Sequence, residues 1–199
     1  MHSQVRRRIS TSICAIGLAL GAAMGCTKQE PPRATEADLV KRGLYLVTVA
    51  GCGDCHTPKV FTKSGPEPDN TRLLSGYPAN AKLPPVPSGV IGPDGWGAIA
   101  NQDLTAWAGP WGISFAANLT PDASGLKSWT PETFIQAIRT GKHAGVGREI
   151  PPPMPWMDYA KMTDDDLRAV FAYLKSLPPV ANTVPDPVPP GGGASPGKS

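Results

Sequence analysis

The stretch Gly51-Cys52-Gly53-Asp54-Cys55-His56 brings two thiols and an imidazole close together in a chain of 199 residues with only four cysteines and three histidines. On one helical turn, Cys55 follows Cys52 at i+3 and His56 follows it at i+4, so the three side chains share a face. Two sulfurs and an imidazole nitrogen can then reach a single bound group. This stretch therefore decides what the remaining elements must surround.

The spacing C-x-x-C-H is typical of covalent attachment of a c-type haem. In this interpretation Cys52 and Cys55 form thioethers with the porphyrin and His56 ligates the iron. A structural zinc site would need four ligands, and the other cysteines, Cys14 and Cys26, lie in an N-terminal leader. A thioredoxin-like pair would need a βαβ pattern that is not visible here, and a plain disulfide leaves His56 unexplained. We therefore expect one haem c.

Residues 1–25 have the pattern of an export signal. Three arginines at positions 6 to 8 precede an apolar run, positions 13 to 24, that is too short to span a bilayer as a mature helix. The run ends in Ala22-Ala23-Met24-Gly25-Cys26, which resembles a lipoprotein box and predicts acylation of Cys26. Ordinary cleavage after a small residue is the alternative. We expect the mature chain on the periplasmic side of a bacterial membrane, held there by the lipid.

The basic balance of the chain belongs to this leader. The full chain has 19 Lys and Arg against 16 Asp and Glu, and removal of residues 1–25 takes away three arginines and no acid. A mature chain with equal numbers of both signs offers no excess of positive charge to nucleic acid. We therefore expect no nucleic-acid partner.

Three helices with threonine N-caps are predicted, over residues 35–50, 130–141 and 163–177. The first leads directly into the motif. Gly43 lies in its middle, where glycine costs about 1 kcal/mol relative to alanine. A close helix crossing is the packing reason that we expect for this glycine.

The remaining segments define the domain organisation. Residues 26–34 are interpreted as a tether, and 35–180 as the haem domain. Within that domain lies a Gly- and Pro-rich insertion, 61–117, whose tryptophans form either a local core or a surface that docks a partner. A small hairpin is predicted over 90–100. The tail, 181–199, has almost nothing apolar to bury and is expected to be disordered.

From about residue 34 to 180 the chain resembles monohaem cytochromes c of the class I type. Three lines, Asn118-Leu119-Thr120-Pro121-Asp122, Ser128-Trp129-Thr130 and Pro153-Met154-Pro155-Trp156, are similar to those of bacterial cytochromes c that accept electrons from periplasmic dehydrogenases. The resemblance implies an all-α, cytochrome c-like fold of three to four helices around one covalently bound haem. It also implies redox partners, namely a dehydrogenase and a terminal oxidase or another cytochrome of the respiratory chain.

Met154 is the expected second axial ligand of the iron. Prolines at 151, 152, 153 and 155 restrict the backbone around it, so a thioether on this segment loses little entropy when it is ordered. The resemblance to the Pro-Met-Pro line of the family supports the same residue. Met157, Met162 and His143 are the alternatives, interpreted as core, surface and loop residues. His/Met ligation raises the potential of a haem, which suits electron transfer.

Two functions from different classes remain open. The first is an electron carrier, not itself an enzyme, that moves electrons between a periplasmic dehydrogenase and the respiratory chain. The second is a haem-based enzyme or gas sensor with an open or weakly occupied sixth position, for which His143 is the one candidate for a distal acid-base group.

Trp129, Tyr159 and Asn118 can also hydrogen-bond a haem propionate, although such residues more often serve packing.

Overall fold

The computed structural model describes residues 34–191. These residues form five α-helices and five short strands. The helices are α1 (Glu36–Val49), α2 (Cys52–His56), α3 (Pro131–Thr140), α4 (Trp156–Tyr159) and α5 (Asp164–Ser176). None of the described helices has the length and apolar character needed to cross a membrane. The predicted export signal and Cys26 lie outside the described residues.

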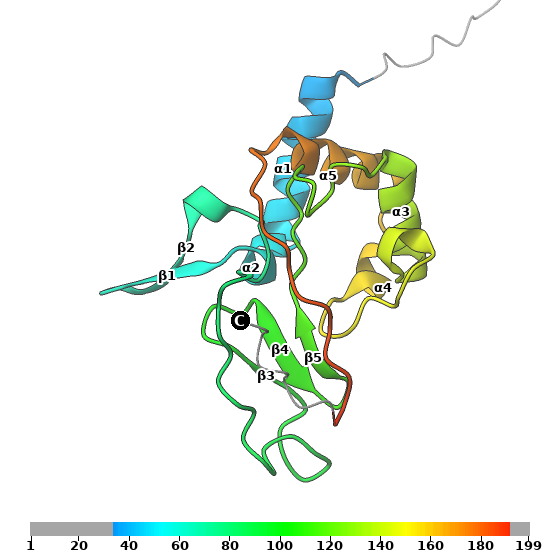
Figure 1. Ribbon diagram of the computed structural model, residues 1–199. Coiled ribbons are helices and arrows are strands. Elements are labelled where there is room, and N and C mark those ends of the chain that lie inside the picture. The colour runs from blue at the N-terminus through cyan, green and yellow to red at the C-terminus, as the bar shows by residue number, and fades with distance from the viewer. Residues whose placement is uncertain (1–33, 192–199) are drawn as a thin grey trace, which may run out of the picture. The chain divides into compact units, whose positions relative to one another are not determined.

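The three predicted helices are confirmed as α1, α3 and α5 (Figure 1). Each begins after a threonine whose hydroxyl accepts a backbone N–H of the first turn: Thr35, Thr130 and Thr163. Such a hydroxyl satisfies one of the N–H groups that a helix start leaves without a partner. Gly141 ends α3 with a φ of 66°, a backbone conformation that glycine adopts without a Cβ penalty.

The close helix crossing predicted at Gly43 is also confirmed. A Cβ on Gly43 would lie 1.9 Å from the carbonyl oxygen of Ala169, so α1 and α5 touch backbone to backbone at this point. Buried residues of the two helices, such as Leu46 and Leu167, belong to the same apolar cluster. An ion pair of 2.9 Å joins Arg42 to Asp166 beside the crossing. These two helices form the frame that carries α2.

The helical frame agrees with the expected all-α fold, but residues 59–115 form two small antiparallel sheets instead of the single hairpin predicted. Strands β1 (Lys59–Thr62) and β2 (Gly65–Pro68) form one antiparallel hairpin. Strands β3 (Ile99–Ala100), β4 (Ala106–Gly109) and β5 (Gly112–Phe115) form a three-stranded antiparallel sheet.

The hairpin predicted over residues 90–100 is wrong in position. That stretch holds only an isolated bridge between Ile91 and Trp96 and the two residues of β3, whereas the tight hairpin is β4–β5. Gly112 has a φ of 96°, so it starts β5 in a conformation that few other residues adopt. Ala106 and Ala108 alternate into the interior, which is the period of a strand with one buried face.

The structure describes the first part of the tail, residues 181–191, and gives it specific contacts. Val188 exchanges two backbone hydrogen bonds of 2.8 and 2.9 Å with Ile113, and Figure 1 shows this segment running beside β5. The Asn182 amide donates to the carbonyls of Ser75 and Tyr77. Composition measures how much apolar surface a segment can bury. This segment is held instead by hydrogen bonds to backbone groups.

Candidate functional site

The whole motif lies on α2. Gly51, with a φ of 66°, turns the chain from the end of α1 into this helix. Cys52, Cys55 and His56 therefore occupy one helical turn, as their spacing predicts. The Lys59 ammonium donates to carbonyls of Gly53, Asp54 and Thr57 at the C-terminal end of α2. A cation there satisfies carbonyls that the helix leaves unpaired and complements the helix dipole.

The His56 imidazole is buried and has a defined tautomer. Its side chain is 9% exposed, and Nδ1 lies 2.8 Å from the carbonyl oxygen of Ala117. A carbonyl only accepts, so Nδ1 carries the proton and Nε2 carries the lone pair. Burial lowers the pKa of His56, which keeps the ring neutral. A neutral imidazole oriented by a hydrogen bond at its other nitrogen is the usual form of a metal-ligating histidine.

The segment that follows β2 donates hydrogen bonds to the end of α2, next to the histidine. The His56 carbonyl accepts from the Gly76 N–H at 2.7 Å, and the hydroxyl of fully buried Thr57 accepts from the Leu74 N–H at 3.0 Å. Leu74 in turn accepts from the Leu119 N–H at 2.9 Å. These bonds link the end of α2 to the segment after β5 that presents the Ala117 carbonyl. The orientation of the imidazole thus depends on residues far along the chain.

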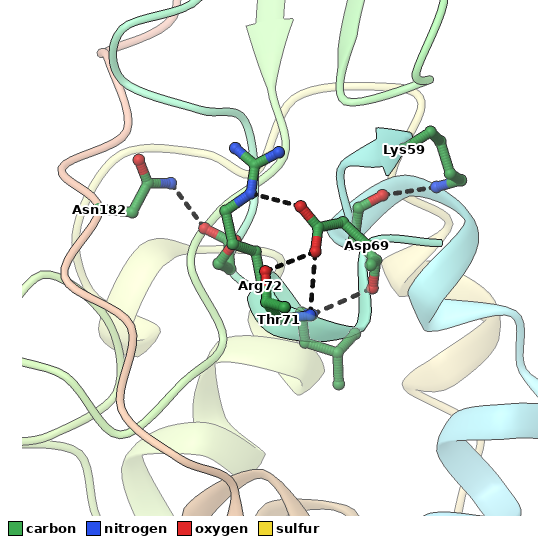
Figure 2. Close-up of polar contacts among 8 residues, drawn as sticks. Lys59, Asp69, Thr71, Arg72 and Asn182 are labelled. Atoms are coloured by element: carbon green, nitrogen blue, oxygen red, sulfur yellow. Dashed lines mark hydrogen bonds and ion pairs between the residues drawn. The ribbon is translucent and has the colours of Figure 1, made fainter. Parts of the chain in front are cut away.

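Asp69 closes the base of the β1–β2 hairpin (Figure 2). Its carboxylate accepts from the N–H and hydroxyl of Thr71 and from Nε of Arg72, at distances of 2.6 to 2.9 Å. These bonds lower the pKa of Asp69 to about 2, first through Thr71 and then through Arg72. The Asp69 N–H donates to the Pro58 carbonyl at 2.8 Å, which returns the chain to the end of α2.

The two cysteines are free thiols and are not joined in a disulfide. Burial raises the pKa of Cys52 to about 11 and also raises the pKa of Cys55. Within residues 34–191, no group of three or more His, Cys, Asp and Glu side chains is arranged to hold a metal ion. The geometry therefore offers two protonated thiols beside an imidazole.

Met154 packs against the same apolar cluster as Cys52. The structure thus brings the expected second axial ligand to the core that also contacts the motif. Among the alternatives, Met157 is 59% exposed, and Met162 packs against the cluster. The rings of His143 and Trp129 pack nearly perpendicular to each other, with their centroids 5.2 Å apart.

Two contacts around the predicted site have no signal in the sequence. The Tyr159 hydroxyl donates to the Ala50 carbonyl at 2.8 Å, which joins α4 to the entrance of the motif. The Ser114 hydroxyl donates to the Pro152 carbonyl at 2.6 Å, which joins β5 to the segment before Met154. Both acceptors are backbone oxygens, a group that every residue possesses, so no residue pattern marks them. The Asn118 amide likewise serves the fold, because it bonds residues 120, 124 and 180.

A cavity of about 880 Å³ lies outside this arrangement. It is bounded by segments 72–80, 122–124 and 180–183, and none of the four predicted haem residues lines it.

The residues around α2 fit a c-type haem. Free thiols at i and i+3 are what thioether formation needs, and the unprotonated Nε2 of His56 is available to iron. The apolar cluster that contacts Cys52 and Met154 suits the body of a porphyrin.

Comparison with known proteins also indicates a cytochrome c. The model of the cytochrome c family matches residues 40–178. The cytochrome c subunit of a quinone-dependent alcohol dehydrogenase from Gluconobacter oxydans is 29% identical over 77% of this chain and 25% of its own length. The cytochrome subunit of fructose dehydrogenase from Gluconobacter japonicus is 26% identical over 83% of this chain and 27% of its own.

A third relative, the cytochrome c subunit of gluconate 2-dehydrogenase from Pantoea cypripedii, is 29% identical over 74% of this chain and 25% of its own length. The chain therefore spans about a quarter of the length of these relatives. The family match covers most of the chain, including α2 and the helices that frame it. By this match and by the geometry of its C-x-x-C-H helix, the chain belongs to the cytochrome c family.

Proposed function

We propose that this chain is the electron-carrying partner of a dehydrogenase and holds one haem c through Cys52 and Cys55, with His56 and Met154 as axial ligands. Family membership implies haem c and electron transfer. When bound, the haem supplies a one-electron couple between ferric and ferrous iron. The chain's own residues supply the covalent attachment, the two ligands and the apolar surroundings.

The hydrogen bond from His56 Nδ1 to the Ala117 carbonyl is the observation that carries this proposal. It leaves Nε2 unprotonated and able to ligate iron, on a histidine that is buried in the protein. Donation to a carbonyl also increases the basicity of the ring, and a more basic imidazole favours ferric over ferrous iron. The Met154 thioether acts in the opposite direction, because a soft sulfur ligand favours ferrous iron. The pair gives a site suited to electron transfer rather than to binding of exogenous ligands.

Covalent attachment can be tested on denatured protein. After acid extraction, the pyridine haemochrome spectrum should remain with the wild-type chain, because thioethers resist extraction. A chain with Cys52→Ala and Cys55→Ala should lose all of its haem to the solvent. Quantitative extraction of haem from the wild type would reject the attachment.

Ligation by Met154 predicts a sulfur-to-iron charge-transfer band in the ferric protein. Met154→Ala should abolish this band, whereas Met157→Ala, a matched change of an exposed methionine in the next turn, should preserve it. If the band survived in Met154→Ala, another residue would hold the sixth position.

Carbon monoxide distinguishes the carrier from a haem enzyme or gas sensor. With Met154 on the iron, ferrous protein at neutral pH should bind carbon monoxide slowly and incompletely. Rapid stoichiometric binding would indicate an open sixth position and would favour the alternative function.

The proposed partner and location rest on the relatives and on the leader. The relatives named above are cytochrome subunits of dehydrogenases, which supports a dehydrogenase as the electron donor. The lipoprotein box supports an acyl group on Cys26 and a place on the periplasmic side of a membrane. In fractionated cells, the wild type should sediment with membranes and Cys26→Ser should be released. Equal sedimentation of both would reject the lipid anchor.

A further inference from the structure

Ser114 of β5 contacts the segment that carries Met154. Its side chain is buried, and its hydroxyl oxygen lies 2.6 Å from the Pro152 carbonyl and 3.4 Å from the Trp107 carbonyl. A hydroxyl has one proton to donate, and the shorter distance assigns that proton to Pro152. The indole N–H of Trp111 donates to the same hydroxyl at 3.3 Å. The hydroxyl is thereby oriented toward Pro152.

The Met154 segment has few other ways to be held by hydrogen bonds. Prolines at 151, 152 and 153 carry no N–H and cannot donate. Within the part of the chain that the structure describes, the bond from Ser114 is the only hydrogen bond from a side chain that reaches residues 151–154. The backbone just before Met154 therefore has one hydrogen bond from a side chain, and that side chain belongs to the insertion.

The strand that supplies this attachment is itself fixed on both edges. On one side β5 pairs with β4, and on the other Ile113, the neighbour of Ser114, exchanges two backbone hydrogen bonds with Val188. A Cβ on Gly112 would lie 2.0 Å from the Val188 carbonyl oxygen, so the tail lies directly against the strand. Because β5 is hydrogen-bonded on both sides, Ser114 has a fixed position from which it can hold the segment that carries Met154.

We propose that Ser114 is a positioning residue for Met154, and that the insertion braces the ligand segment through this one hydrogen bond. This inference rests on the proposed role of Met154 as the sixth ligand. Ser114 acts by lowering the population of states in which the segment has moved away. In those states the sixth position is accessible to an external ligand.

Imidazole binding to the ferric holoprotein measures this population. An external ligand competes with Met154 only in the displaced state, so its apparent affinity is proportional to the fraction displaced. Ser114→Ala should tighten apparent imidazole binding about fivefold, the factor that corresponds to one net hydrogen bond of ~1 kcal/mol. The titration is followed by loss of the sulfur-to-iron charge-transfer band. Ser114→Thr keeps the hydroxyl and should bind imidazole more weakly than Ser114→Ala does.

Ser124→Ala is the matched control. Ser124 also has a hydroxyl with several partners, since it donates to Asp122 and accepts from the Asn118 amide and the Asn182 N–H. None of these partners belongs to the Met154 segment, so its loss should leave the imidazole affinity unchanged. Equal affinities of wild type and Ser114→Ala would overturn the positioning role, as would the same increase in Ser124→Ala.

The two levels of the proposal fail in different ways. If Met154→Ala keeps the charge-transfer band, the ligand assignment itself is wrong. If Met154→Ala loses the band while Ser114→Ala matches the wild type in imidazole affinity, Met154 is the ligand and only the brace is rejected.

Discussion

The α1–α5 crossing and the insertion with its tail are held together by different forces. At the crossing, shape decides: Gly43 lets two helix backbones touch, and apolar side chains fill the space around them. In the insertion and tail, side-chain amides and hydroxyls bond to backbone carbonyls, as Asn182 and Ser114 do. The helical frame therefore depends mainly on packing, whereas the parts added to it depend mainly on hydrogen bonds to backbone groups. Each kind of contact fails in its own way when it is changed.

Gly43→Ala should have the largest effect on stability, because it attacks the packing directly. The new Cβ would lie 1.9 Å from the Ala169 carbonyl oxygen, so the helices must separate. We expect a loss of about 3 kcal/mol in the free energy of unfolding, measured by urea denaturation. Gly53→Ala, a helical glycine whose nearest neighbour would be the Thr57 hydroxyl at 3.6 Å, should change it by less than about 1 kcal/mol. Equal changes in the free energy of unfolding for the two variants would show that helix propensity, and not the helix crossing, explains the effect of Gly43→Ala.

Asn182→Ala should rank second and act locally. The side-chain amide donates to the carbonyls of Ser75 and Tyr77 and accepts from the Ala79 N–H, so three hydrogen bonds are lost. The expected loss is about 2 kcal/mol, with hydrogen exchange increased in residues 181–191 and unchanged in α1 and α5. Asn80→Ala, a change of an exposed neighbour, is the control. Uniform acceleration across the molecule would mean that tail and frame unfold together.

Tyr159→Phe should have a smaller effect, because it removes one polar contact between α4 and the entrance of α2. The Ala50 carbonyl loses its bond of 2.8 Å to the phenol, at a cost of about 1 kcal/mol. Tyr45→Phe on the exposed face of α1 is the matched control and should be silent in the same urea titration. A silent Tyr159→Phe would show that the packing of the ring, not its hydroxyl, joins these helices.

The smallest effect concerns Asp69 and appears only in acid. Its pKa is about 2 in the folded chain, against about 3.9 for an unfolded aspartate. Between these values the unfolded state binds more protons, so the stability from this carboxylate is complete above about pH 4 and is lost as the pH falls to about 2. Asp69→Asn should flatten that part of the stability curve relative to wild type. Parallel curves for the two proteins would show that Asp69 makes no such contribution.

Much of the frame was predictable because its signals are local. Threonine caps, the glycine stop of α3 and the glycine in α1 act within one or two turns of helix, so residue type and spacing reveal them. The helical placement of Cys52, Cys55 and His56 followed from the same reasoning. The hairpin was harder, because several Gly- and Pro-rich turns in the insertion compete and the choice of β4–β5 depends on what each strand buries.

The sequence by itself determined the chemistry of the attachment motif, the helices that carry it and the family to which the chain belongs. Only the tertiary structure decided what orients that chemistry: Ala117 for the imidazole of His56, Ser114 for the segment before Met154, and Asn182 for the tail. These contacts join residues 38 to 107 positions apart, and in each a side chain bonds a backbone carbonyl. Because every residue has a carbonyl, the partner is chosen by the path of the chain and not by residue type.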